Sequence, residues 1–355
     1  MSGWPDRRLL DLTGARHPIV QAPMAGASDA TLAIAAIRAG AIESLPCAML
    51  SPEQVNAQVT EVRAAADGPL NLNFFCHTMP GEPDDSAWRA LLQPYYSEFG
   101  IVDAGDPPPA RKPFGPAMAE IVEAVRPEIV SFHFGLPEPA LFARVRAAGA
   151  AILGNATSVA DARACAAAGC DAIIAQGWEA GGHAGVHDPT DDGSAQMGLF
   201  ALVPQIADAT GLPVIAAGGI ADARGIAAAL MLGASGVQIG TTYLRTPEAR
   251  ISPMHRALLD TTDAEATRFT TAFSGGRARG IVNRLMRELA ATPRDAPPFP
   301  LASQALAPLR RAAEARGDAG FSPLWAGQSA RLGRSEAAAA LTERLAGETL
   351  ALLNR

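Results

Sequence analysis

Short, uninterrupted apolar segments alternate with helix-like segments from residue 18 to residue 259, and this repeat limits the folds open to the chain. The apolar segments do not alternate with polar residues, as is typical of strands buried on both faces. Strands are expected at residues 18–22, 41–45, 69–75, 128–134, 151–155, 171–175, 213–217 and 236–240. Eight such strands, each followed by a helix, predict an α/β protein with a closed (β/α)8 TIM barrel.

Two segments depart from the repeat. Residues 76–114 are rich in proline and too long for an ordinary connection, so we expect a partly helical insertion at the rim. The eighth unit is expected to end in a helix over residues 248–259. The sequence therefore predicts a barrel over residues 1–265 and a C-terminal helical extension over residues 266–355, with a proline-rich link around residues 293–300, that packs on the barrel.

Composition excludes several classes of function. The net charge of −7 argues against a nucleic-acid-binding protein, and no apolar run reaches the roughly 20 residues of a membrane span. Residues 1–8 lack the apolar core of a secretory signal, so a cytoplasmic protein is expected. Lys112 is the single lysine and lies in a loop-like stretch, which argues against Schiff-base chemistry at a strand end.

A glycine-rich stretch after the sixth predicted strand contains one histidine, His183. Its glycines, which let the backbone approach a ligand and make a helix costly, are Gly177, Gly181, Gly182 and Gly185. A metal site would need Glu179, His183 and His187 on one helical face, so the glycines argue against it. Two readings stay open: a catalytic histidine and a loop histidine that binds backbone.

The ends of the seventh and eighth predicted strands are suited to binding a phosphate. Loops at these positions of a TIM barrel commonly bind phosphate through backbone N–H groups. The candidate residues are Ala217, Gly218, Gly219, Gln238, Gly240 and Thr241. A tight turn at Gly218 and Gly219 is the simpler alternative, but the polar Gln238 within an apolar strand requires a partner, which we expect to be a ligand.

Other strand ends carry groups that suit the edge of a flat ring. Ala22, Pro23 and Met24 form a rigid apolar ledge after the first strand, although Pro23 and Met24 could equally close the core. Asn73 and Gln176 add amides that can both donate and accept hydrogen bonds. Together these residues predict flavin mononucleotide (FMN), and the absence of a G-x-G-x-x-G motif favours it over a flavin dinucleotide.

His133 is expected near the end of the fourth strand, where side chains of a barrel turn into the active site. We interpret it, with Met24, as lining a substrate pocket, and a core histidine is the alternative. Its neighbours Phe132 and Phe134 are then expected to face the surrounding helices.

These segments together resemble the nitronate monooxygenase family between about residues 14 and 330. The motifs that carry the resemblance are Gln21-Ala-Pro-Met24, Asn71-Leu-Asn-Phe-Phe75, Ser131-Phe-His-Phe-Gly-Leu-Pro137, Ala175-Gln-Gly-Trp-Glu-Ala-Gly-Gly-His183, Ala216-Ala-Gly-Gly-Ile220, Val237-Gln-Ile-Gly-Thr241, Arg279-Gly-Ile-Val-Asn-Arg284 and Leu324-Trp-Ala-Gly-Gln328. The resemblance implies an FMN-dependent barrel that oxidises alkyl nitronates, with nitroalkanes as further candidates, using O2 and releasing a carbonyl compound and nitrite. It also implies that His183 is the catalytic histidine.

The chain departs from the family pattern at several positions. Ala184 stands where relatives often have arginine, the motif Gly275-Gly-Arg-Ala-Arg-Gly280 replaces Gly-Arg-Pro-Ala-Arg-Gly, and Glu43 replaces a small residue. These departures leave the substrate preference open. Similar barrels occur in FMN-dependent NAD(P)H:quinone reductases and enoyl-thioester reductases, and a flavin-binding barrel without turnover is a third hypothesis. A homodimer is compatible with the sequence.

Overall fold

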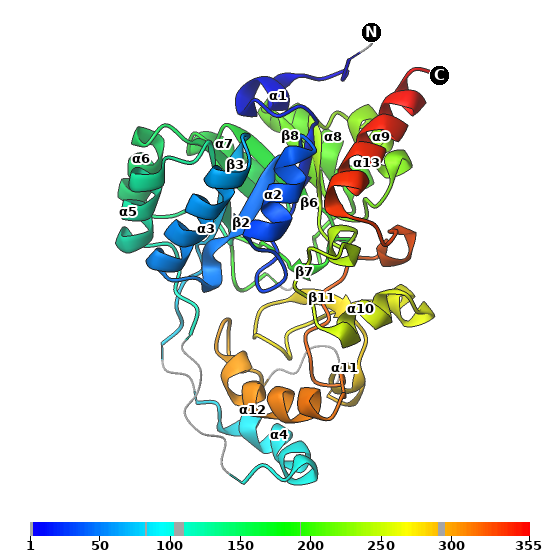
Figure 1. The fold of residues 1–355 in the computed structure, drawn as a ribbon. Helices are drawn as coiled ribbons and strands as arrows, with labels where there is room; N and C mark the ends of the chain where they lie inside the picture. The colour runs from blue at the N-terminus through cyan, green and yellow to red at the C-terminus, as the bar shows by residue number, and fades with distance from the viewer. Residues whose placement is uncertain (1–2, 82–83, 103–109, 192, 290–294) are drawn as a thin grey trace.

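Eight parallel strands form the centre of the molecule (Figure 1). The computed structural model describes residues 3–81, 84–102, 110–191, 193–289 and 295–355. The strands, in chain order, are β1 (Ile19–Gln21), β2 (Glu43–Pro46), β3 (Leu70–Phe75), β4 (Ile129–His133), β5 (Ala151–Ala156), β6 (Ala172–Gln176), β8 (Val214–Ala217) and β9 (Gly236–Ile239). They pair in the order β1-β9-β8-β6-β5-β4-β3-β2, and a parallel bridge between Val20 and Ile42 joins the two ends. The predicted closed barrel is confirmed.

Most barrel strands are buried along their whole length, because one face packs inside the barrel and the other against helices. Ile42, directly before β2, lies in the inner core, whereas Leu45 of β2 lies in the outer core. The surrounding helices are α2 (Ala30–Arg38), α3 (Pro52–Ala65), α5 (Pro116–Val125), α6 (Pro139–Ala147), α7 (Val159–Ala167), α8 (Leu199–Thr210), α9 (Ala223–Met231) and α13 (Ala338–Leu353). Among the described residues, no helix combines the length and apolarity that crossing a membrane requires.

Side-chain caps fix where several of these helices begin. Asp29 accepts a hydrogen bond from the Thr31 N–H at the start of α2. Ser51 forms a capping box with Gln54, and Ser158 forms one with Asp161 at the start of α7. These caps satisfy backbone N–H groups of the first turn and so fix where the three helices begin.

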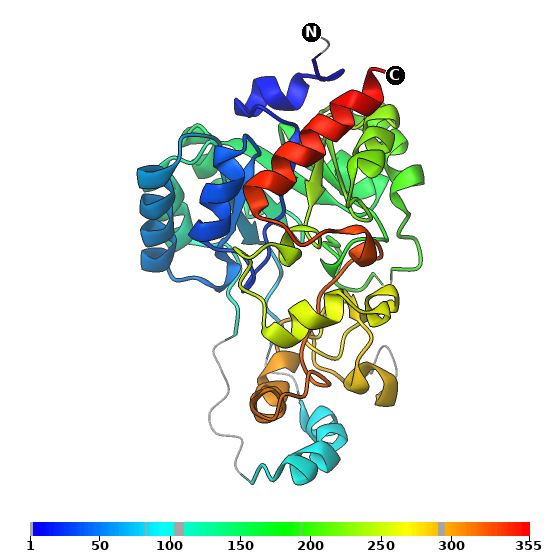
Figure 2. The same ribbon diagram turned by 45° about the vertical axis from the view of Figure 1, so that its right-hand side comes forward.

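The eighth outer helix is not the one that the sequence predicts. The segment expected to be helical over residues 248–259 forms only α10 (Pro253–Leu259), which begins at a proline after Ser252. The C-terminal helix α13 instead contacts both α9 and α2, and thereby fills the last position around the barrel (Figure 2). A long-range contact of this kind leaves no local signal in the sequence.

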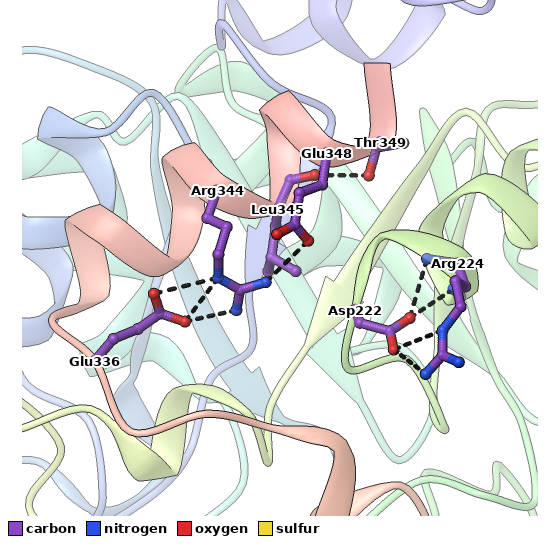
Figure 3. A network of polar contacts seen from close by, with 8 residues as sticks. Asp222, Arg224, Glu336, Arg344, Leu345, Glu348 and Thr349 are labelled. Atoms are coloured by element: carbon purple, nitrogen blue, oxygen red, sulfur yellow. Dashed lines mark hydrogen bonds and ion pairs between the residues drawn. The ribbon is translucent and has the colours of Figure 1, made fainter. Parts of the chain in front are cut away.

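Helix α13 is held to the barrel by polar as well as apolar contacts. The Glu248 carboxylate accepts from the Ala338 N–H at 3.1 Å, and the hydroxyls of Tyr243 and Thr342 are 2.7 Å apart. Arg344 binds Glu336, before the helix, and Glu348 one turn later (Figure 3). Figure 3 also shows Asp222 and Arg224 at the start of the neighbouring α9.

A smaller layer, called here the cover layer, lies over the carboxyl ends of the strands (Figure 1). It consists of helices α4 (Ser86–Phe99), α11 (Arg284–Glu288) and α12 (Ala302–Ala315) and a sheet of β7 (Gly182–His183), β10 (Thr267–Thr270) and β11 (Ala278–Ile281). Its own apolar core includes Trp88 and Phe321. Helix α4 confirms that the 76–114 insertion is partly helical; residues 82–83 and 103–109 of the insertion, and 290–294 at the proline-rich link, lie outside the described residues.

Candidate active site

His183 lies in a short strand that connects the barrel to the cover layer. Strand β7 pairs antiparallel with β11, with His183 opposite Ala278 and Gly182 opposite Arg279. The sequence predicts a loop here, which is wrong for these two residues. Their pairing partner is almost a hundred residues away in the chain, and Gly182 takes a φ of 73° that favours glycine.

The glycines of this stretch are needed mainly because other parts of the protein come close. A Cβ at Gly181 would lie 2.5 Å from the backbone of Ala326, and a Cβ at Gly185 would lie 2.6 Å from the His133 ring. Gly177 is similarly crowded, whereas a Cβ at Gly182 would meet nothing within 4 Å. The interpretation that these glycines leave room for a ligand therefore holds, at most, for Gly182.

The ring of His183 is held by one hydroxyl and several aromatic rings. Its Nε2 is hydrogen-bonded to Ser274 Oγ at 2.8 Å. The centroid of its ring lies 5.1–6.4 Å from those of Phe299, Trp325, Phe134 and Phe75. The Ser274 hydroxyl and the surrounding rings hold the imidazole in one orientation, as a catalytic imidazole requires.

Phe134 departs from the predicted alternation of strand β4. Phe132 packs in the outer core as expected. Phe134 instead turns toward the site and contacts the rings of His133, Phe75 and Phe299. The reason is its left-handed backbone, with a φ of 64° directly after the strand, which is costly for a large side chain and is found where tertiary contacts compensate for it.

The electrostatics of the site keep His183 uncharged. Burial lowers the pKa of His183 well below its ordinary value, and the charges of Arg111, His133 and His77 lower it further. Burial also lowers the pKa of His133 to about 4. Both rings are therefore neutral near pH 7, and each can accept or donate a proton but cannot act as a fixed cation.

Three side chains from the barrel hold the backbone of the His183 strand. The Gln176 amide donates to the His183 carbonyl at 2.8 Å and accepts from the Gly185 N–H at 2.7 Å. His133 Nε2 is 3.2 Å from the same carbonyl, and Asn155 donates to the Gly185 carbonyl. The side chains of Gln176 and His133 thus bind the protein backbone. That Gln176 binds the cofactor and that His133 lines the substrate pocket stay predictions.

Glu179, His183 and His187 do not converge on one point. The Glu179 carboxylate accepts from the Leu199 N–H at 3.1 Å, and His187 Nε2 lies 2.8 Å from the Asn155 carbonyl. His183 faces Ser274 instead. Nor does any group of three potential metal ligands occur elsewhere in the described residues.

A cavity of 830 Å³ opens beside His183, between the barrel and the cover layer. Its walls include His183, Phe75, Ser274 and Trp325, together with residues 110–118 from the end of the insertion and residues 303–310 around the start of α12. The rim insertion and the C-terminal extension therefore both contribute to the cavity. His133 and Met24, predicted to line the substrate pocket, are not among the residues that surround this cavity.

The predicted phosphate-binding residues gather at the ends of β8 and β9. Gly218 and Gly219 have φ values of 124° and 65°, so they also form the tight turn that was the alternative reading. The Thr241 hydroxyl accepts from the Gly327 N–H at 2.9 Å, and the Ser329 hydroxyl donates to the Gly219 carbonyl at 2.6 Å. The segment 326–329 therefore lies over these strand ends.

Two buried amide oxygens lie on the neighbouring strands β1 and β9. Gln238 Oε1 and Gln21 Oε1 have no hydrogen-bond partner among the described residues. Ala22 and Met24 at the end of β1 lie 3.5 and 3.7 Å from where a Cβ of Gly240 would be, so the two strand ends form one surface. Asn73, at the end of β3, is buried and donates to Ser131 Oγ at 2.9 Å.

Several residues of the site were not predicted. Ser274, Trp325 and Phe299 come from the C-terminal extension, and Arg111 comes from the insertion. The family-like motif around Trp325 was the one available signal among them. Without knowledge of which distant segments fold over His183, the others cannot be distinguished from ordinary surface or core residues.

Two departures from the family pattern have different surroundings. Ala184 is buried and its N–H donates to the Arg277 carbonyl at 2.9 Å. Glu43 is fully buried at the start of β2, and neither carboxyl oxygen has a partner in the described part of the chain. Burial raises the pKa of Glu43 well above its ordinary value and so favours the neutral form of the carboxyl group. Nothing in the structure explains why a glutamate occupies this position.

Comparison with known proteins places these observations in a family context. The family model described as nitronate monooxygenase matches residues 6–348. The nitronate monooxygenase of Paraburkholderia phytofirmans is 42% identical to this chain, over 96% of this chain and 94% of its own length. The nitronate monooxygenase of Pseudomonas aeruginosa is 40% identical to this chain, over 96% of this chain and 98% of its own length. The structure of a nitroalkane oxidase from Streptomyces ansochromogenes is similar with a TM-score of 0.90 and 36% identity, covering 98% of this chain and 99% of that one.

Proposed function

Because the chain belongs to the nitronate monooxygenase family, we propose that it oxidises alkyl nitronates with O2 to a carbonyl compound and nitrite. The observation that carries this proposal is the uncharged His183, held by Ser274 and aromatic rings at the wall of a cavity large enough for a small organic substrate. Nitroalkanes are a second substrate class, supported by the similarity to a nitroalkane oxidase.

The enzymes of this family are flavoproteins, and we propose FMN as the flavin. Ala22, Pro23, Met24, Asn73, Gln176, Gly181 and Gly182 would surround the ring, and Ala217, Gly218, Gly219, Gln238, Gly240 and Thr241 would hold the phosphate end. The orphaned Gln238 and Gln21 oxygens support a ligand with hydrogen-bond donors at this place. When bound, FMN accepts electrons from the organic substrate and passes them to O2.

The chain's own residues prepare the substrate. A neutral imidazole can take a proton from the carbon beside a nitro group, which converts a nitroalkane into its nitronate. Ser274 keeps the His183 ring in place for this transfer, and the four surrounding aromatic rings keep water away. His133 and Gln176 position His183 through its backbone carbonyl.

An anaerobic titration tests the function. We expect purified protein to be yellow, and its flavin absorbance to be bleached by ethyl nitronate but not by NADH. Bleaching by NADH alone would instead favour the reductase reading, since a reductase takes its electrons from a nicotinamide. A colourless protein that FMN does not turn yellow would contradict every flavin-dependent reading. Cytoplasmic location and a homodimer are kept as further predictions.

A further inference from the structure

The cavity beside His183 is lined by cationic side chains without acidic ones. Arg111, Lys112 and Arg310 contribute to its walls, and no aspartate or glutamate does so among the described lining residues. A cavity of this charge attracts anions and disfavours cations. The three cations differ, however, in how far each is already neutralised or exposed to water.

Within the described part of the chain, Arg111 is the cation of this group without a compensating charge. Arg310 is exposed and binds Glu314 at 2.7 Å, and Lys112 is exposed to solvent. Arg111 is partly buried, and its guanidinium faces the Phe299 ring at 5.9 Å without an ion pair to any carboxylate of the described residues. A partly buried charge without a partner is unfavourable, and an anionic ligand would relieve that cost.

The backbone holds Arg111 in this position. The Arg111 carbonyl lies 3.1 Å from His77 Nε2, and the His77 ring packs against Phe299 at 4.8 Å. Phe299 in turn packs against His183 at 5.1 Å. One aromatic contact chain therefore links the Arg111 segment to the His183 ring.

The charge of Arg111 also affects the pKa of His183. The positive charge of Arg111 is the largest contribution after burial to the lowered pKa of His183. His183 is consequently neutral and cannot itself supply the positive charge that an anionic substrate needs. The surroundings of the ring therefore do not support a cationic His183 that holds the nitronate.

We propose that Arg111 binds the anionic group of the substrate, which leaves His183 free for proton transfer. This inference rests on the proposed oxidation of nitronates. A nitronate is planar and carries its negative charge on two oxygens, and the planar guanidinium fork is suited to bind both of them. Arg111 is thus a specificity-determining residue that favours nitronates over neutral nitroalkanes.

Steady-state kinetics of Arg111→Met test this role. Removing a charge-assisted hydrogen bond should raise the KM for ethyl nitronate about 10- to 100-fold. The KM for neutral nitroethane should change by less than about 3-fold. Arg111→Lys keeps the charge without the planar fork and should give an intermediate KM for the nitronate.

Arg310→Met is the matched control, because Arg310 lines the same cavity but is neutralised by Glu314. Its KM for ethyl nitronate should stay within about 3-fold of the wild-type value. Equal effects of the two methionine variants would overturn the proposal, since they would reflect only the total charge of the cavity. Equal rises in KM for nitronate and nitroalkane in Arg111→Met would also overturn it.

Nitrate binding measured by calorimetry separates this inference from the proposed function. Nitrate is a planar anion and is not oxidised, so its affinity does not depend on turnover. We expect wild-type protein to bind it more tightly than Arg111→Met by about 10-fold or more. If wild-type protein does not oxidise nitronates, but Arg111→Met binds nitrate more weakly than wild type, the proposed function is refuted and the anion site is retained. Equal nitrate affinities would refute the anion site.

The thermal stability of the variant gives a readout of a different kind. Because no carboxylate of the described residues pairs with Arg111, Arg111→Met should unfold at the same temperature as wild type or at a higher one. A marked drop in Tm would show that Arg111 is held by the protein itself, contrary to the proposal. Arg111→Lys then distinguishes a loss of fold from a loss of substrate binding, because it preserves the charge.

Discussion

His183 and His187 lie four residues apart on one segment, yet their surroundings drive their charges in opposite directions. His183 faces Ser274, aromatic rings and the cation Arg111, and its pKa is lowered. Burial also disfavours the charged form of His187, but Cys165, Asp161 and the Asn155 carbonyl outweigh it and raise the pKa of His187 to about 9. Burial and the hydrogen-bonding and charged groups that folding brings close, rather than the local sequence, decide which histidine is neutral.

The difference separates a reactive histidine from a structural one. His187 Nδ1 lies 3.8 Å from Asp161, and that carboxylate also caps α7. His187 therefore ties the end of the His183 segment to an outer helix of the barrel. His183 has no carboxylate partner in the described residues and lies at the cavity wall instead. Substitutions of the two should affect different properties of the protein.

The largest effect is expected for His183→Ala. Loss of the proton-transferring imidazole should lower kcat with nitroethane about 10²- to 10⁴-fold. Tm and flavin content should stay close to wild type, because the ring makes one side-chain hydrogen bond and contacts a cavity. Stopped-flow reduction of the flavin measures the loss. A variant that keeps wild-type turnover on both nitroalkanes and nitronates would remove the catalytic assignment.

Gly185→Ala adds a methyl group between His183 and His187 and should have an intermediate effect. In Gly185→Ala the new Cβ would lie 2.3 Å from Asn155 Nδ2 and 2.6 Å from the His133 ring, so the strand or the barrel side chains must move. We expect a loss of about 1–3 kcal/mol in the free energy of unfolding, together with slower turnover. Urea unfolding measures the loss.

Gly182→Ala provides the control for this substitution. Its Cβ would meet no atom within 4 Å, so its cost should come from the positive φ alone and be about 1 kcal/mol. If Gly185→Ala were as stable as wild type, close packing against His133 would not be what holds the His183 segment in place.

The smallest effect is expected for His187→Gln. Glutamine can still donate to the Asn155 carbonyl but lacks the positive charge that Asp161 stabilises. We expect a loss of about 1–2 kcal/mol in the free energy of unfolding near pH 6, with kcat unchanged. Because the pKa of His187 is raised in the folded state, protonated His187 stabilises the fold. This stabilisation is fully present below the ordinary pKa of 6.5 and is lost as the pH rises through about 9.

Urea unfolding at two pH values checks this prediction. The difference between wild type and His187→Gln should shrink between about pH 6 and about pH 9.5. His133→Gln is the contrasting variant, because the pKa of His133 is lowered to about 4 and its neutral form is the stable one. A difference for His187→Gln that grows with pH would contradict the assigned charge.

The sequence predicted the barrel, but it predicted neither the strand that contains His183 nor most residues of the cavity. The apolar strands are local signals, because each is a short uninterrupted run of buried residues that can be recognised without its partners. Phe134 was assigned to the wrong side of β4, because alternation describes a strand only until its backbone leaves the extended region. Arg111 and Ser274 were missed because each comes from a segment whose place depends on long-range packing.

What the sequence determined by itself is the succession of eight apolar strands and the glycine-rich segment that ends in a candidate catalytic histidine. These features follow from periodicity and backbone preference, which act over a few residues. The tertiary structure decided that α13, rather than α10, completes the ring of helices, and that Gln176 and His133 hold the backbone at His183. It also decided the charges of His183 and His187, because a pKa depends on burial and on charges brought close only by folding.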